Sequence, residues 1–152
     1  MDKRNVIIVT VVDFNKAVLK FNDLILKGFI GVNGSSENKV EGDKKTPIGE
    51  FEIGVVLGMH NRDELYISNT IEYVKITNSM YWVCDVNSKY YNQLIDVSSK
   101  NKDWKEAEHL IEYKEEYEYA IEIKSNPNNV PNKGSAIFLH CGTGNTSRMY
   151  CS

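Results

Sequence analysis

The 152-residue sequence has little cysteine and little proline, with only three of each. Cys84, Cys141 and Cys151 are odd in number and lack the spacing of paired metal ligands, which argues against a disulfide framework and a structural zinc site. A zinc site formed by His140, Cys141 and Cys151 would fit no usual ligand pattern. We therefore expect neither a metal nor an organic cofactor.

The sequence also lacks an excess of positive charge and any apolar run of membrane-spanning length. Because its net charge is −3, we expect no binding to nucleic acid. The first apolar run, Val6–Val12, is interrupted by Thr10 and followed by Asp13, and it has no small-residue cleavage site. It is therefore predicted to be a strand and not a signal peptide.

Short segments with the composition of strands fill most of the chain. The nine tyrosines favour strands, because aromatic side chains cover pleated, half-buried surfaces. A turn-like sequence, Asp13–Lys16, separates the first two segments and predicts an opening hairpin. The polar segment Asn33–Thr46 is predicted to be a loop. The strands predicted in this part of the chain are Val6–Val12, Ala17–Asn22, Lys27–Val32, Phe51–Val55, Tyr73–Ile76 and Tyr81–Asp85.

The last third of the chain is predicted to contain one short helix and two strands. Trp104–Ile111 is predicted as a helical turn, whereas apolar residues at every second position predict a strand over Tyr117–Lys124. The turn-rich connector Ser125–Gly134 leads into a predicted buried strand, Ser135–His140. The sequence thus indicates one mainly β domain over residues 1–152.

Two separated motifs suggest a function. The first, Glu41-Gly-Asp-Lys-Lys-Thr-Pro-Ile-Gly-Glu-Phe51, follows Gly31-Val-Asn-Gly34 and has the composition of a turn into a strand. The second, Gly134-Ser-Ala-Ile-Phe-Leu-His140, delivers a histidine from a strand end into a glycine-rich loop with cysteines nearby. An imidazole in such a position can hold a cysteine as the thiolate, which favours acyl transfer through a thiol.

In order and spacing, the two motifs resemble the conserved blocks of the L,D-transpeptidase catalytic domain (the YkuD-like, ErfK/YbiS family) over about Val6 to Thr146. The resemblance implies a mainly β fold, a mixed β-sandwich with one short helix. It also implies that a cysteine attacks a peptidoglycan stem peptide to form a thioester, which an amine of a second stem resolves as a 3→3 cross-link. His140 matches the catalytic histidine of the family. The residues that match the expected wall of the substrate cleft are Glu41, Gly42, Asp43, Lys45, Thr46, Pro47 and Gly49.

The sequence departs from the family at its nucleophile. The family pattern Thr-Ala-Gly-Cys is missing after Thr146, and Met149 occupies the position expected for the cysteine. Cys141 and Cys151 are candidate substitutes, although neighbouring side chains on a strand point to opposite faces, which disfavours pairing of Cys141 with His140. Backbone N–H groups near Gly142 and Gly144 are expected to hold the oxyanion. Because the chain stops at Ser152, we expect the last strand or strands of the family fold to be missing.

Three functions follow from the resemblance and stay open at this level. The chain is expected to be an L,D-transpeptidase, impaired as written; a thiol L,D-carboxypeptidase or hydrolase; or a catalytically dead domain that binds peptidoglycan. The implied partners are stem peptides and carbapenem-type inhibitors. The family works in the cell envelope, whereas the chain itself carries no convincing signal peptide.

Our hypothesis for the last residues is a shift of reading frame after Thr146. If Ser147-Arg148 is encoded AGC-AGG, the phase displaced by one base reads Ala-Gly, and the codons of Met149-Tyr150 then supply a cysteine codon. We therefore predict that sequencing the gene finds AGC-AGG ahead of the methionine codon. AGT for Ser147 together with AGA for Arg148 would contradict the frameshift, because the displaced phase would then read Val-Glu and neither Ala nor Gly would emerge.

Overall fold

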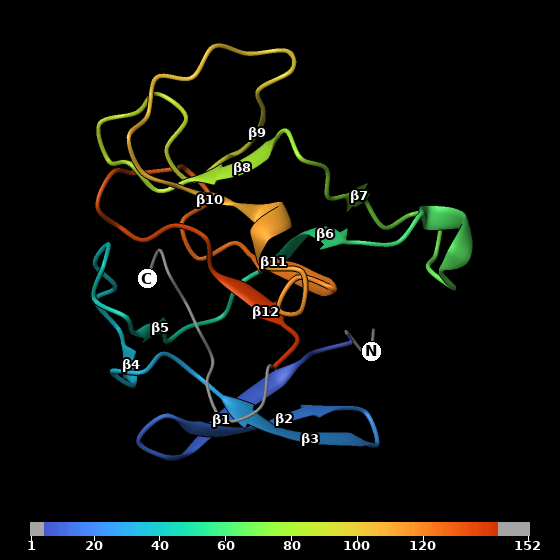
Figure 1. The fold of residues 1–152 in the computed structure, drawn as a ribbon. Coiled ribbons are helices and arrows are strands. Elements are labelled where there is room, and N and C mark those ends of the chain that lie inside the picture. The colour runs from blue at the N-terminus through green and yellow to red at the C-terminus, as the bar shows by residue number, and fades with distance from the viewer. Residues whose placement is uncertain (1–4, 143–152) are drawn as a thin grey trace.

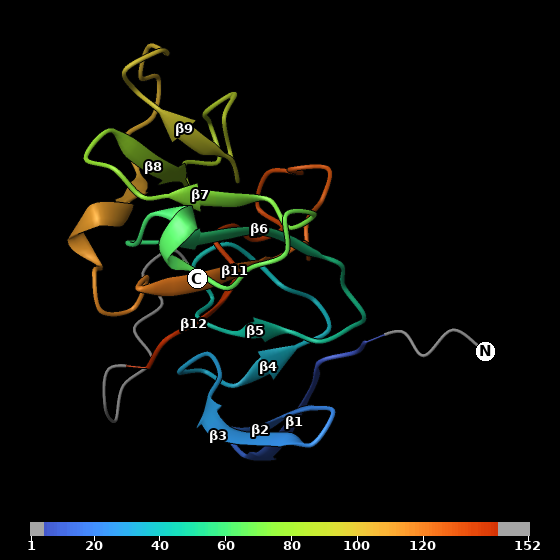
Figure 2. The same cartoon turned by 90° about the vertical axis from the view of Figure 1, so that its right-hand side faces the viewer.

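The computed structural model describes residues 5–142 and is mainly β, which confirms the mainly β class predicted from the sequence (Figures 1 and 2). The strands of this part of the chain form four sheets, in the orders β1-β2-β3, β10-β8-β9, β12-β11-β6-β7 and β4-β5. In both views the four-stranded sheet lies between the N-terminal sheet and the sheet that contains β8. No helix in the described range has the length and apolar character needed to cross a membrane.

The N-terminal sheet is an antiparallel meander of β1 (Ile8–Asp13), β2 (Lys16–Phe21) and β3 (Leu24–Phe29). The predicted opening hairpin is confirmed. The third strand, however, begins three residues before the predicted Lys27 and ends at Phe29. Its early start follows from a tight turn at Asn22, whose φ of 51° is a backbone conformation that asparagine tolerates better than most residues.

The central sheet combines antiparallel and parallel pairing. β11 (Tyr119–Ile123) pairs antiparallel with both β6 (Ile53–Gly58) and β12 (Phe138–His140), and β6 pairs parallel with β7 (Tyr73–Lys75). The strand predicted over Ser135–His140 is shorter in the structure, because Ala136 has a φ of 53° and cannot extend the strand.

The main core is formed by the central sheet and the segments around β8 (Met80–Val83). Trp82 meets Phe138 edge to face, with ring centroids 4.8 Å apart, and Tyr117 meets the same ring at 5.5 Å. The buried members of this cluster are Leu57, Ile76, Trp82, Leu110, Tyr117, Ala120, Ala136 and Phe138. Since Phe138 precedes His140 by two residues on the same strand, this core fixes the strand that ends in the histidine.

The predicted helix at Trp104–Ile111 is wrong. This segment contains β10 (Ala107–His109), which pairs with β8, followed by a short 3₁₀ turn, η2 (Leu110–Glu112). Its Glu108 is buried and accepts a hydrogen bond from the Tyr117 hydroxyl, so tertiary contacts override the helical composition of the segment.

Four further elements were not predicted from the sequence. The segment Asn33–Thr46, predicted as a loop, includes β4 (Ser35–Ser36), which pairs in parallel with β5 (Thr46–Pro47). The others are β9 (Leu94–Asp96), which pairs with β8, and the 3₁₀ turn η1 (Arg62–Glu64).

Gly31 lies where two segments approach closely. A Cβ atom at this position would stand 2.4 Å from the carbonyl oxygen of Lys44 and 2.8 Å from the Cα of Lys45, and both are backbone atoms that cannot move cheaply. We predict that Gly31→Ala lowers the free energy of unfolding by about 3 kcal/mol in urea denaturation.

Gly28 provides the control, because nothing lies within 4 Å of its Cβ position. Gly28→Ala should leave the free energy of unfolding within about 0.5 kcal/mol of the parent value. If the loss at Gly31 is no larger than the loss at Gly28, the close approach is not present in solution.

Candidate functional site

His140 ends β12, opposite Ala120 of β11. Its Nδ1 lies 2.8 Å from the carbonyl oxygen of Cys141, and its ring meets Tyr117 edge to face at 5.7 Å. Because a carbonyl oxygen can only accept, Nδ1 must carry the proton, and Nε2 of the neutral ring is then the basic nitrogen. The half-buried imidazole is therefore held in one tautomer, with a nitrogen able to take a proton.

The thiol of Cys141 has a different partner from the imidazole. Its Sγ donates to the carbonyl oxygen of Tyr119 at 3.7 Å, and its backbone N–H donates to Glu116 at 3.1 Å. The structure thus places Cys141 beside His140 in the sequence but engages its sulfur elsewhere. Of the other predicted residues of this loop, Gly142 is exposed, whereas Gly144, Met149 and Cys151 lie outside the described residues.

Within the first motif, Asp43 organises the loop. Its carboxylate accepts hydrogen bonds from the backbone N–H groups of Val40 and Lys45, both at 2.9 Å, and forms an ion pair with the buried Lys39. Burial acts to raise the pKa of Asp43, but the hydrogen bonds from Lys39 and the two backbone groups outweigh it and lower the pKa. Asp43 is thus held as a carboxylate that closes a turn.

Other residues of this motif also make contacts within the loop. Thr46 accepts a hydrogen bond from the backbone N–H of Gly31 at 2.8 Å, and Pro47 lies in β5. Gly42 has a φ of 74°, which favours glycine, and the ring of Phe51 covers Gly49. These contacts give the motif a structural role.

Tyr91 joins the two motifs. Its buried hydroxyl donates a hydrogen bond to the carboxylate of Glu41 and accepts one from the backbone N–H of Gly134 at 3.0 Å. A further backbone hydrogen bond of 3.1 Å runs from Glu41 to Asn132. The first motif is therefore tied directly to the residues that lead into the His140 strand.

Asn92 extends this connection. Its Oδ1 accepts hydrogen bonds from Ala136 N–H at 3.2 Å and from the Trp82 indole at 3.1 Å. Its Nδ2 donates to Asn126 and Asn129, both at 3.1 Å. We call Tyr91 and Asn92 the Tyr91–Asn92 clamp, since together they hold the connector that precedes β12. In the sequence, the segment Tyr90–Asn92 falls in the order expected from the family resemblance, but nothing there indicated that Tyr91 and Asn92 contact this connector.

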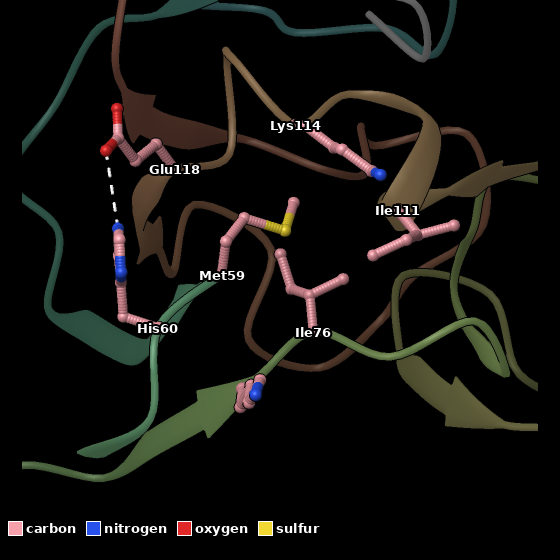
Figure 3. A pocket seen from close by; sticks show the side chains of 7 residues that line it. Met59, His60, Ile76, Ile111, Lys114 and Glu118 are labelled. Carbon is pink, nitrogen blue, oxygen red and sulfur yellow. Dashed lines mark hydrogen bonds and ion pairs between the residues drawn. The ribbon is translucent and has the colours of Figure 1, made fainter. Parts of the chain in front are cut away.

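The described part of the surface includes two shallow hollows of different lining. The larger, of about 380 Å³, has Met59, Ile76 and Ile111 as apolar lining, with Lys75, Lys114, His60 and Glu118 around them (Figure 3). The imidazole Nε2 of His60 lies 3.3 Å from Glu118. The second, of about 260 Å³, is lined in part by Lys39, Pro47 and Ser125. His140 lines neither hollow, and of the predicted cleft residues only Pro47 lines the second.

The described residues contain no group of three or more His, Cys, Asp or Glu side chains placed to hold a metal ion. No family model, curated protein or solved structure matches the sequence.

The Tyr91 hydroxyl should contribute measurably to stability. Tyr91→Phe leaves the Glu41 carboxylate and the Gly134 N–H without this partner, so we predict a loss of about 1–3 kcal/mol in the free energy of unfolding. Tyr90→Phe is the matched control, because Tyr90 is adjacent in the chain and only half-buried. Equal effects of the two substitutions in urea denaturation would contradict the role of the clamp.

Glu41 should make stability depend on pH. Burial is the largest influence on its carboxyl and raises the pKa above the ordinary 4.5, against the opposing hydrogen bond from Tyr91. The folded state then binds the Glu41 proton more tightly than the unfolded state, so this contribution is full below pH 4.5 and is lost as the pH rises through the raised pKa.

We therefore predict that the stability of the parent protein relative to Glu41→Gln falls as the pH rises across this window. Urea denaturation of both proteins at a series of pH values measures the difference. A constant difference would show that the pKa of Glu41 is not raised in the folded state.

Proposed function

We propose that this chain is an L,D-transpeptidase-type domain that acts on peptidoglycan stem peptides by cysteine–histidine acyl transfer, with its activity impaired as written. The observation that carries this is His140, whose Nδ1 is bound by a backbone carbonyl and whose Nε2 is thereby the basic nitrogen. The link from Glu41 through Tyr91 to Gly134 supports it further, since it brings together the two segments that resemble this family.

In the proposed reaction, Nε2 of His140 takes the proton of a cysteine thiol, and the thiolate attacks the carbonyl carbon between the third and fourth residues of a stem peptide. The C–N bond to D-alanine breaks, the leaving amine takes the proton from the imidazolium, and a thioester remains. The amine of a second stem then attacks the thioester carbonyl and gives a proton to Nε2 of His140, and the new amide forms as the C–S bond breaks and the thiolate departs. Backbone N–H groups near Gly142 would stabilise the negative oxygen formed in each attack.

The nucleophile that this reaction needs belongs at position 149, where the sequence has methionine. Cys141 is a poor replacement, because its sulfur is engaged by the Tyr119 carbonyl and not by the imidazole. These two observations favour a second candidate, a domain of the same kind that binds stem peptides without cleaving them.

Restoring the missing pattern tests the proposal. We predict that Ser147→Ala/Arg148→Gly/Met149→Cys, incubated with a tetrapeptide stem or a carbapenem, gains a covalent adduct on residue 149 by intact-protein and peptide mass spectrometry. Removing the base with His140→Ala in the same background should slow adduct formation about 100-fold or more.

Ser147→Ala/Arg148→Gly with Met149 retained is the matched control and should form no adduct. Adduct formation that does not depend on His140 would contradict the assigned role of the histidine. A folded triple variant that forms no adduct would overturn the proposed reaction, and binding of the stem peptide without an adduct would then support the binding domain.

A further inference from the structure

The larger hollow combines an apolar floor with a charged rim. Met59, Ile76 and Ile111 converge on its centre and belong to the main core or pack against it (Figure 3). We call these three residues the apolar floor. The volume of about 380 Å³ lies near the lower end of the range for small-molecule sites, roughly 300–1,000 Å³, and therefore suits a small ligand. The charged and ionisable residues of the rim are His60, Lys75, Lys114 and Glu118.

Contacts within the chain hold the walls of this hollow in place. The backbone N–H of Met59 donates to the carbonyl oxygen of Glu118 at 3.3 Å. The carbonyl oxygen of His60 accepts from the Tyr73 hydroxyl at 2.7 Å, and the His60 ring stacks on Tyr119 with the centroids 5.5 Å apart. Because the hollow exists before a ligand enters, binding would need little ordering of side chains.

The rim has one more positive charge than the acidic groups of the hollow balance. Within residues 5–142, Lys114 has no hydrogen-bond or ion-pair partner. Lys75 donates only to the uncharged Oδ1 of Asn61 at 2.8 Å, so its ammonium retains unused donors. The carboxylate of Glu118 lies 3.3 Å from Nε2 of His60 and is thereby already engaged. Counted with a neutral imidazole, two ammonium groups and one carboxylate leave one positive charge uncompensated.

We propose that this hollow binds a small monocarboxylate with a short aliphatic chain. The carboxylate would accept charge-assisted hydrogen bonds from Lys114, at one side of the hollow, and would also be attracted by the charge of Lys75 (Figure 3). The aliphatic chain would lie on the apolar floor, where the flexible Met59 adapts to its shape.

The same charges exclude other classes of small ligand. A cation would be repelled by the two lysines. A dianion such as phosphate would exceed the available positive charge, would face the carboxylate of Glu118, and would leave the apolar floor uncovered. His140 does not line the hollow, so this site does not depend on the proposed reaction.

Sodium hexanoate is a suitable probe. It is titrated into protein with ¹³C-labelled methionine and isoleucine methyl groups, and binding is followed by ¹H–¹³C NMR. We expect the methyl signals of Met59 and Ile111 to shift saturably with a dissociation constant of about 1 mM, because a shallow site leaves part of the ligand in water. Hexan-1-ol should bind at least about tenfold more weakly, since it lacks the charge that Lys114 attracts. Hexylammonium should cause no saturable shift.

Lys114→Met removes the ammonium group and keeps an unbranched apolar side chain, so we expect it to raise the dissociation constant for hexanoate at least about tenfold. Lys102→Met is the matched control, because Lys102 is also exposed but does not line the hollow. It should bind hexanoate as the parent protein does. The methyl spectra without ligand establish that both variants are folded.

Three results would overturn the proposal. The first is the absence of a saturable shift at Met59 and Ile111, or shifts spread equally over exposed methyl groups elsewhere, such as that of Ile25. The second is hexan-1-ol binding as tightly as hexanoate, which would indicate an apolar surface without recognition of the carboxylate. The third is an equal dissociation constant for Lys114→Met and the parent protein.

Discussion

The hydroxyl group of Tyr91 is the point on which the arrangement of the candidate site depends. It is buried, it donates to the Glu41 carboxylate and it accepts from the Gly134 N–H, so one side chain satisfies a charged group and a backbone group that come from distant parts of the chain. A buried polar group without a hydrogen-bond partner destabilises the folded state by more than a formed hydrogen bond stabilises it. The loop of the first motif and the connector before β12 are therefore held in one relative position, and Asn92 fixes the next residues of the same connector.

The residues between the Tyr91–Asn92 clamp and His140 are held by further contacts. Ala136 bonds to Asn92 and bends the chain with its positive φ, after which Phe138 enters the core against Trp82 and Tyr117. His140 follows on the same face, against the Tyr117 ring, with its tautomer set by the carbonyl of Cys141. Each step is a contact between residues, and together they explain why a histidine at the end of a three-residue strand has a defined orientation.

The sequence was informative where the determinants are local. Alternation from Tyr117 to Ile123 predicted β11, and the turn residues at Asp13–Lys16 predicted the first hairpin, because both signals lie within a few residues. The segment containing Glu108 was misassigned because its carboxylate is buried by a bond to Tyr117 that composition does not reveal. The clamp was also missed because its contacts are long-range. Glu41 and Tyr91 are 50 residues apart, and nothing in the local sequence of either residue indicates that they form a hydrogen bond. His140 could be singled out from its surroundings in the sequence, but its tautomer could not.

The hydrogen bond between the Gly134 N–H and the Tyr91 hydroxyl is tested most directly by the exchange rate of the Gly134 amide proton. In amide hydrogen exchange followed by NMR on ¹⁵N-glycine-labelled protein, the buried Gly134 N–H should exchange at least about 100-fold more slowly than the N–H of the exposed Gly142. That result would place the Tyr91 hydroxyl between the two motif segments in solution. Exchange of Gly134 as fast as that of Gly142 would mean that the bond is not formed, and that the two segments are not held together in the way described.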